Sequence, residues 1–161
     1  MSQIEVLVGM IASGKSSWCG KRAKEGWLVI NDDAITSAVH GGNYSLYNKS
    51  LKPLYKLIEN NILHVAIALG KNVVIDRGLD IDPRSRARWI CLARSLDVPI
   101  RAVCFEYFSP EIHAQRRFES DNRGRSYDFW LEVANVHSKR FYFPVIEEGF
   151  TEVETKNWEN Q

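Results

Sequence analysis

Residues 9 to 16 read Gly-Met-Ile-Ala-Ser-Gly-Lys-Ser, and this short stretch decides the fold class of the chain. It is a complete GxxxxGK(S/T) pattern. The apolar run Ile4–Val8 precedes it and suits a strand that is buried on both faces of a parallel sheet. A segment with helical spacing begins at Lys15. Strand, glycine-rich loop and helix therefore follow one another in the order that this pattern needs in order to bind phosphate.

The chemistry of this loop is that of an anion cradle. Glycines at both ends let the backbone curl so that successive N–H groups point inward, and the following helix adds the partial positive charge of its N-terminus. Lys15 can reach the β and γ phosphates of ATP, and the Ser16 hydroxyl can ligate Mg²⁺, so we predict both cofactors. The alternative is a glycine-rich turn with a solvated lysine. The predicted nucleotide-binding residues of the loop are Gly9, Met10, Ile11, Ala12, Ser13, Gly14, Lys15, Ser16 and Ser17.

The rest of the chain alternates between strand-like and helix-like segments, which is the signature of βαβ units. Further strands are predicted at the apolar runs 27–30, 72–75 and 99–105, with a last edge strand at 150–153. Helices are predicted over 15–24, 51–69, 83–96, 110–119 and 127–141. We expect an α/β fold with an open parallel sheet of about five strands flanked by helices, of the P-loop NTPase or nucleoside-monophosphate-kinase type. No repeat or linker divides residues 1–161, so a single domain is expected.

Composition and charge exclude several classes of protein. Among 161 residues, 45% are hydrophobic and 25% are charged, and no apolar run reaches the length of a membrane span. The N-terminus lacks the pattern of a secretory signal, so we expect a cytoplasmic protein without a membrane partner. The three cysteines and four histidines form no metal-binding pattern. Nothing in the sequence predicts the oligomeric state.

Two carboxylates directly follow the second predicted strand. Asp32 and Asp33 come after an apolar run that ends at Ile30, so they fall at the C-terminal edge of the sheet, where open α/β folds bind ligands. Phosphoryl transfer to an alcohol needs a carboxylate that orients the hydroxyl and accepts its proton. We predict that one of the pair is this general base. One or both can instead cap the helix that follows.

A third carboxylate, Asp76, ends the apolar run Val73–Ile75. P-loop proteins use an acid at the end of a hydrophobic strand near their Mg²⁺ and its waters, so Asp76 is a predicted metal ligand together with Ser16. Asp76 can instead cap a turn at Gly78. The neighbouring Arg77 either neutralises Asp76 or contacts a substrate phosphate.

Arginine is concentrated in one part of the chain. Ten of the twelve arginines lie between Arg77 and Arg125, a stretch without lysine, and the guanidinium fork suits bidentate phosphate binding. We therefore expect an anionic substrate. Arginines also surround a predicted loop between two helices and define a lid over residues 116–128. Arg117 and Arg123 are predicted to stabilise the transferring phosphoryl group and Arg116 to bind the nucleotide, with a solvated basic face as the alternative.

These landmarks, taken in order over residues 4–119, resemble the kinase domain of 5′-hydroxyl polynucleotide kinases, including the phage type and the kinase half of end-healing repair enzymes. The resemblance is best in the phosphate loop, in Asn31-Asp32-Asp33 and in Val73–Asp76. Pro83–Trp89 is similar to the family's helix after the second acid. The resemblance implies Asp33 as the general base, Asp76 as an acid that contacts the site, and a lid arginine near Arg117 or Arg123.

Three positions, in two parts of the chain, depart from the family's pattern. Arg77-Gly78 stand where the family continues with Asn and Thr, and Thr36 stands where phage members carry an arginine for the acceptor phosphate. Nucleotide handling is therefore expected to match the family better than acceptor recognition. Tyr44, Tyr47 and Trp89 either stack on bases or belong to the core.

We expect a kinase that transfers the γ-phosphoryl group of ATP to a hydroxyl of a nucleic acid or nucleotide, first of all a polynucleotide 5′-OH. Two alternatives remain. The first is a kinase of a hydroxymethylated base in DNA or of a small hydroxylated molecule such as a nucleoside, because small P-loop kinases share their donor apparatus. The second is an ATP-dependent switch or binding module that is not a kinase.

Overall fold

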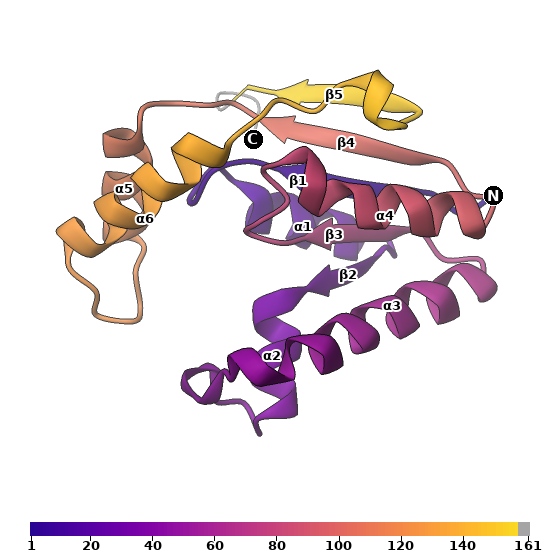
Figure 1. Cartoon of the computed structure of the whole chain (residues 1–161), viewed down its shortest axis with the longest axis horizontal. Helices are drawn as coiled ribbons and strands as arrows, with labels where there is room; N and C mark the ends of the chain where they lie inside the picture. Colours follow the sequence, from indigo (N-terminus) through magenta and orange to yellow (C-terminus); the bar gives the residue numbers. More distant parts are fainter. Residues whose placement is uncertain (158–161) are drawn as a thin grey trace.

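The computed structural model describes residues 1–157, and within these residues five strands form one sheet (Figure 1). The strands are β1 (Ile4–Val8), β2 (Leu28–Asn31), β3 (Val73–Asp76), β4 (Ile100–Phe105) and β5 (Glu152–Lys156). Their order across the sheet is β2-β3-β1-β4-β5, and every neighbouring pair is parallel. The predicted open parallel sheet is confirmed.

Helices connect these strands, and the five that were predicted over 15–24, 51–69, 83–96, 110–119 and 127–141 lie close to those ranges. The helices are α1 (Lys15–Lys24), α2 (Asp32–Val39), α3 (Lys52–Ala68), α4 (Pro83–Ser95), α5 (Pro110–Glu119) and α6 (Tyr127–Arg140), with short 3₁₀ helices η1 (Tyr44–Leu46), η2 (Lys49–Leu51) and η3 (Ile146–Glu148). The Asp82 side chain accepts a hydrogen bond of 2.9 Å from the backbone N–H of Ser85, which fixes the start of α4. No helix within residues 1–157 is both long and apolar enough to cross a membrane.

The last strand begins two residues later than its apolar run predicts. Pairing with β4 starts at Glu152, opposite Arg101, and continues to Lys156. Phe150 instead packs its buried side chain into the core, and Thr151 bonds the carbonyl oxygen of Ile100 through both its N–H and its hydroxyl. The apolar residue therefore fills the core before the strand, and β5 itself is a polar edge strand.

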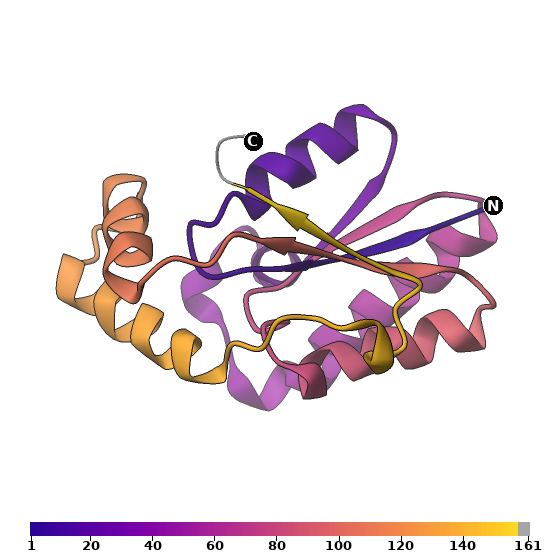
Figure 2. The same ribbon diagram turned by 90° about the horizontal axis from the view of Figure 1, so that it is seen from above.

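The strands supply two cores, one on each face of the sheet. Figure 2 shows α1 on one face and α3 and α4 on the other. Leu7, Val74 and Phe105 pack with Cys19 of α1, whereas the other face packs against Leu63 of α3, among other residues. Because neighbouring residues of a strand point to opposite faces, the continuous apolar runs feed both cores.

Several features of the sequence meet at the carboxyl edge of this sheet. Asn31 at the end of β2 pairs with Asp76 at the end of β3, and the loop after β1 lies at the same edge. The antiparallel pair α5 and α6 lies beyond this edge (Figure 1), and Met10 packs against Ala114 and Trp130 of these helices. The fold thus brings the phosphate loop, the strand-end acids and the arginine-rich hairpin together.

Candidate active site

The loop between β1 and α1 is tightly wound. Gly14 and Ala12 have φ angles of 99° and 49°, in the left-handed region, and residues held there are common where a backbone must curl around a ligand. A Cβ at Gly9 would lie 2.5 Å from Ser13 Oγ and 3.1 Å from the Cβ of Phe105, so only glycine allows this close approach. The first N–H groups of α1 have no partner within the helix and are available to an anion.

Lys15 lies across the loop. Its Nζ donates hydrogen bonds of 2.7 Å to the carbonyl oxygens of Gly9 and Met10. Burial lowers the pKa of Lys15, and the negative charge of Asp76 opposes this effect. A buried ammonium group that is held only by neutral carbonyl oxygens fits a site that receives phosphate oxygens.

The acids at the ends of β2 and β3 are joined by Asn31. Its Nδ2 donates a hydrogen bond of 3.1 Å to Asp76 Oδ2, while its Oδ1 accepts the N–H of Ala34 and caps α2. Asn31 is therefore the cap of α2, so neither Asp32 nor Asp33 is needed for that role. On the sequence alone, either acid could cap the helix that follows, but Asn31, which is an equally good cap residue, occupies that position.

Ser16 and Asp76 line the same cavity. Within residues 1–157, no cluster of His, Cys, Asp and Glu could hold a metal ion by itself. Mg²⁺ that binds with a nucleotide needs few protein ligands, because phosphate and water oxygens complete its shell. One hydroxyl and one carboxylate therefore fit this ion.

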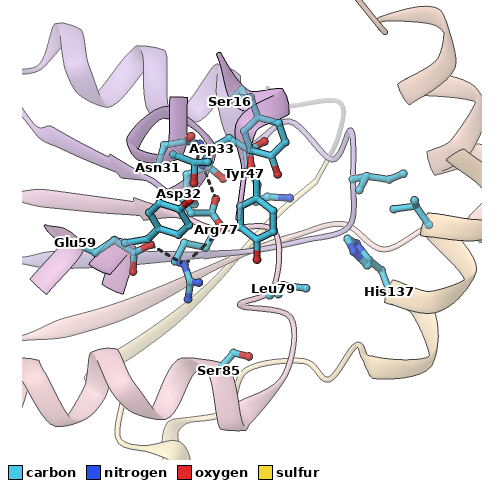
Figure 3. A pocket seen from close by; sticks show the side chains of 18 of the residues that line it. Ser16, Asn31, Asp32, Asp33, Tyr47, Glu59, Arg77, Leu79, Ser85 and His137 are labelled. Atoms are coloured by element: carbon cyan, nitrogen blue, oxygen red, sulfur yellow. Dashed lines mark hydrogen bonds and ion pairs between the residues drawn. The ribbon is translucent and has the colours of Figure 1, made fainter. Parts of the chain in front are cut away.

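The cavity has a volume of about 900 Å³ and is bounded by the phosphate loop, α2, η1, α3, α4 and α6 (Figure 3). Small-molecule sites span roughly 300 to 1,000 Å³, so this one has room for a nucleotide and part of a second substrate. Of the predicted catalytic side chains, all six line this cavity: Lys15, Asp32, Asp33, Asp76, Arg117 and Arg123.

Asp32 and Asp33 occupy different environments. Asp32 Oδ2 lies 3.6 Å from Arg77 Nε, and burial raises the pKa of Asp32 to about 6, although the charge of Arg77 opposes this shift. The Asp33 side chain is 49% exposed, and its Oδ2 accepts a hydrogen bond of 3.1 Å from Arg123 Nη2. One carboxylate is thus held in the wall of the cavity and the other faces its interior.

Glu59 is a site residue that sequence reasoning missed. It is 1% exposed in the middle of α3, and its carboxylate lies 3.3 Å from Arg77 Nε and 2.6 Å from Arg88 Nη1. Arg77 also lies 3.6 Å from Asp80, so it pairs with three acids and not with Asp76. The signal was present in the helical spacing, because Glu59 shares the buried face of α3 with Tyr55, Leu63 and Ala66.

Two arginines of the α5–α6 hairpin line the cavity. The Arg123 guanidinium lies 4.7 Å from the centre of the Tyr44 ring, and Arg117 lies 4.7 Å from the ring of Trp130. The Tyr44 ring also stacks with that of Tyr47 at a centroid distance of 6.3 Å, and burial raises the pKa of Tyr44 to about 12. The arginine-rich hairpin is thus in contact with α2 and η1 across the cavity.

Six of the ten predicted nucleotide-binding residues do not line the cavity: Gly9, Met10, Ser13, Gly14, Ser17 and Arg116. Arg116 lies over the ring of Phe108 at 4.4 Å, and Ser17 is exposed on α1. The roles given to them stay predictions. Trp89, which sequence reasoning weighed as a stacking residue, is fully buried and donates a hydrogen bond to Asp80.

Comparisons with known proteins agree with this geometry. Residues 4–143 match the family described as AAA domain. The bifunctional polynucleotide phosphatase/kinase of Schizosaccharomyces pombe is 29% identical over 160 residues, which cover 94% of this chain and 33% of that protein. The chain therefore spans about a third of the length of the curated relative it matches.

Solved structures share the fold. A chain of the Pnkp1/Rnl/Hen1 RNA repair complex superposes with a TM-score of 0.65 at 17% identity, over 88% of this chain and 47% of that one. A gluconokinase from Sinorhizobium meliloti 1021 superposes with a TM-score of 0.56 at 17% identity, over 97% and 82% of the two chains. With the family match, the phosphate loop and the order of the sheet taken together, the chain belongs to the AAA domain family and is a P-loop kinase domain similar to that of polynucleotide kinases.

Proposed function

We propose that this protein transfers the γ-phosphoryl group of ATP to a hydroxyl of a nucleic acid, with the 5′-hydroxyl end of a polynucleotide as the preferred acceptor. The observation that carries the proposal is that Lys15 of the phosphate loop and the half-exposed carboxylate of Asp33 line one cavity. The phosphatase/kinase name of the fission yeast relative supports a polynucleotide as the acceptor class.

On the donor side, the loop N–H groups and Lys15 bind the phosphates of ATP. Contact with the γ-phosphate replaces the hydrogen bonds that Lys15 makes to the carbonyl oxygens of Gly9 and Met10. Ser16 and Asp76 would hold Mg²⁺, which would offset the negative charge of the phosphates. Ser17 and Arg116 complete the nucleotide-binding set in this proposal.

On the acceptor side, Asp33 orients the attacking hydroxyl. Its carboxylate accepts the hydroxyl proton while the oxygen forms a bond to the γ phosphorus and the bond from that phosphorus to the bridging oxygen of ADP breaks. Asp33 suits this role better than Asp32, because it is half-exposed to the cavity whereas Asp32 is held beside Arg77. Asp32 keeps the arginine in place.

The lid, proposed to span residues 116–128 of a single domain, supplies positive charge to the transferring group. Arg123 is paired with Asp33, but both side chains are 40% or more exposed, and such pairs are weak. Arg123 can therefore exchange this carboxylate for a phosphoryl oxygen at little cost in free energy. Arg117 adds a second guanidinium from the same hairpin.

The test is transfer of label from γ-labelled ATP with Mg²⁺ to a panel of acceptors: 5′-hydroxyl DNA and RNA oligonucleotides, DNA with hydroxymethylated bases, and free nucleosides. The proposal expects label on the oligonucleotides. Label on a modified base or on a nucleoside would support kinase activity but would contradict the proposed 5′-hydroxyl acceptor. ATP turnover that no acceptor stimulates would favour a nucleotide-dependent switch.

A further inference from the structure

The cations that line the cavity come from two parts of the fold. Lys15, Arg117 and Arg123 belong to the phosphate loop and to the α5–α6 hairpin, beside the place where the triphosphate binds in the proposed function. A second group, Lys52 and Lys56 at the start of α3 and Arg84 at the start of α4, lies on the part of the wall that carries Glu59 and Arg77. Two separate groups of positive charge suggest two anions.

The second group has no acidic partners. Arg77 and Arg88 in the same wall are paired with buried carboxylates, chiefly Glu59. By contrast, no ion pair among residues 1–157 involves Lys52, Lys56 or Arg84. Lys52 and Lys56 are one helical turn apart, so both project from one face of α3 toward the cavity. The positive charge on this wall is therefore available to a ligand.

An aromatic ring stands beside these cations. Tyr47 is 40% exposed and lines the cavity (Figure 3). Its ring stacks on Tyr55 with a centroid distance of 5.8 Å and an interplanar angle of 29°. The Tyr55 hydroxyl accepts a hydrogen bond from the backbone N–H of Asn48 and shares another with His40 Nε2, and these two bonds hold the Tyr55 ring in place. Tyr47 is thus a supported ring with an exposed part, which an unstacked base can contact.

The ring is connected to the proposed base. Tyr47 also stacks on Tyr44, with centroids 6.3 Å apart, and Tyr44 lies under Arg123, which is bonded to Asp33. A ligand that lies on Tyr47 is therefore next to the place where the acceptor hydroxyl must sit.

We propose that Tyr47, Lys52, Lys56 and Arg84 form an acceptor subsite for the end of a single-stranded polynucleotide. The 5′-terminal nucleoside contacts Tyr47, and the first phosphates on its 3′ side contact the two lysines and Arg84. The subsite rests on the proposed function, because it presents the 5′-hydroxyl to Asp33. It also explains how a cavity wall whose position 36 is a buried, neutral threonine can recognise an anionic acceptor.

The charges are tested with the double variant Lys52→Ala/Lys56→Ala. The matched control is Lys49→Ala/Lys71→Ala, which removes the same charge from exposed side chains that do not line the cavity. Fluorescence anisotropy of a 3′-labelled 5′-hydroxyl oligothymidylate, without ATP and over a range of salt, measures binding. We expect about tenfold weaker binding and a salt slope reduced by roughly 0.7 per lost phosphate contact, with unchanged ATP binding.

The ring is tested with Tyr47→Leu and Tyr47→Phe. Loss of the ring is expected to raise the acceptor KM about tenfold, whereas Phe keeps the ring and should stay within about twofold of the wild type. The KM for ATP should not change in either variant. If Tyr47 contributed only to stability, its replacement would change the KM for the acceptor and the KM for ATP together.

A second acceptor comparison isolates the phosphate contact. A nucleoside 3′-phosphate carries the phosphate that the two lysines should bind, and the free nucleoside lacks it. The wild type should prefer the 3′-phosphate, and Lys52→Ala/Lys56→Ala should lose this preference. Wild-type protein that binds and phosphorylates the oligonucleotide while the double variant matches its control would overturn the subsite alone. Wild-type protein that neither binds nor phosphorylates the oligonucleotide would overturn the proposed function as well.

Discussion

The two sides of the cavity are built in different ways. The phosphate loop is eight consecutive residues, and most of its binding groups belong to the backbone and to the N-terminus of α1. The opposing wall combines side chains that are far apart in the sequence, such as Asp33, Glu59 and Arg77. A site that binds the phosphate donor common to many kinases can be encoded by one short motif. A site for a particular acceptor depends on the packing of whole helices.

The two sides also differ in how their charges are balanced. Lys15 bonds only to carbonyl oxygens, so it is ready to exchange them for phosphate. Arg77 and Arg88 share the buried Glu59, and a buried ion pair resists change because removing one partner leaves the other uncompensated. Substitutions on the donor side should therefore lower activity more than stability, whereas substitutions in the wall around Glu59 should mainly lower stability.

The largest expected effect is on the donor side. Lys15→Ala should lower kcat by at least about a hundredfold, because a preorganised charge aimed at the transition state is worth several kcal/mol. Its thermal unfolding should be close to that of the wild type, since the Lys15 side chain makes only two replaceable hydrogen bonds. Lys24→Ala at the exposed end of α1 is the control. Activity within about tenfold of the wild type would show that the loop does not hold the reacting phosphates.

The second effect separates the two neighbouring acids. Asp33→Asn should lower kcat by about 10² to 10⁴-fold with ATP binding retained, as expected for loss of a general base. Asp32→Asn should cost less, and part of its cost should appear as lower stability because Arg77 loses a partner. Steady-state kinetics of both variants against an oligonucleotide acceptor makes the comparison. The reverse order of effects would transfer the role of base to Asp32.

The third effect belongs to the buried wall. Glu59→Gln keeps the shape of the side chain but leaves Arg77 and Arg88 without their shared charge, and should lower the free energy of unfolding by about 3 kcal/mol. Urea unfolding measures it. Glu132→Gln on the exposed side of α6 should change stability by less than about 0.5 kcal/mol. Equal effects of the two variants would mean that the network around Glu59 contributes little.

The smallest effect is a pH dependence. Burial raises the pKa of Asp80 to about 7 from an ordinary value of 3.8, against the charge of Arg77. A carboxyl group that binds its proton more tightly when folded adds stability below about pH 4 and loses it as the pH rises toward about 7. Asp80→Asn removes this loss and keeps an oxygen for the Trp89 N–H. Between about pH 5 and 7.5, the free energy of unfolding of this variant should therefore fall by roughly 2.5 kcal/mol less than that of the wild type. Parallel unfolding curves across this range would contradict the assignment.

Local patterns in the sequence were sufficient for most of the fold. The apolar runs that became β1, β3 and β4 are buried on both faces of the sheet, and Asp82 caps α4 as its Asp-Pro step indicates. The start of the last strand was predicted wrongly because Phe150 was taken as a strand residue. Its apolar side chain packs into the core before the strand begins. The predicted end of a strand is wrong where an apolar residue is buried by the core and not by pairing with a neighbouring strand.

The site was less accessible from the sequence. The loop and the strand-end acids could be predicted, since parallel strands end at a common edge. The helical spacing could place Glu59 on the buried face of α3, but its pairing with Arg77 could not be predicted, because the two residues belong to different elements of the fold. Tyr47 likewise could not be separated from a core aromatic until its exposure in the cavity was known.

Phosphoryl transfer to a 5′-hydroxyl end can be tested with a single pair of acceptors. Two oligonucleotides of the same sequence, one with a 5′-hydroxyl and one with a 5′-phosphate, are incubated with γ-labelled ATP and Mg²⁺, and Lys15→Ala serves as the blank. The account predicts label at the 5′ end of the first oligonucleotide and none on the second. Equal labelling of both, or of neither, would contradict it.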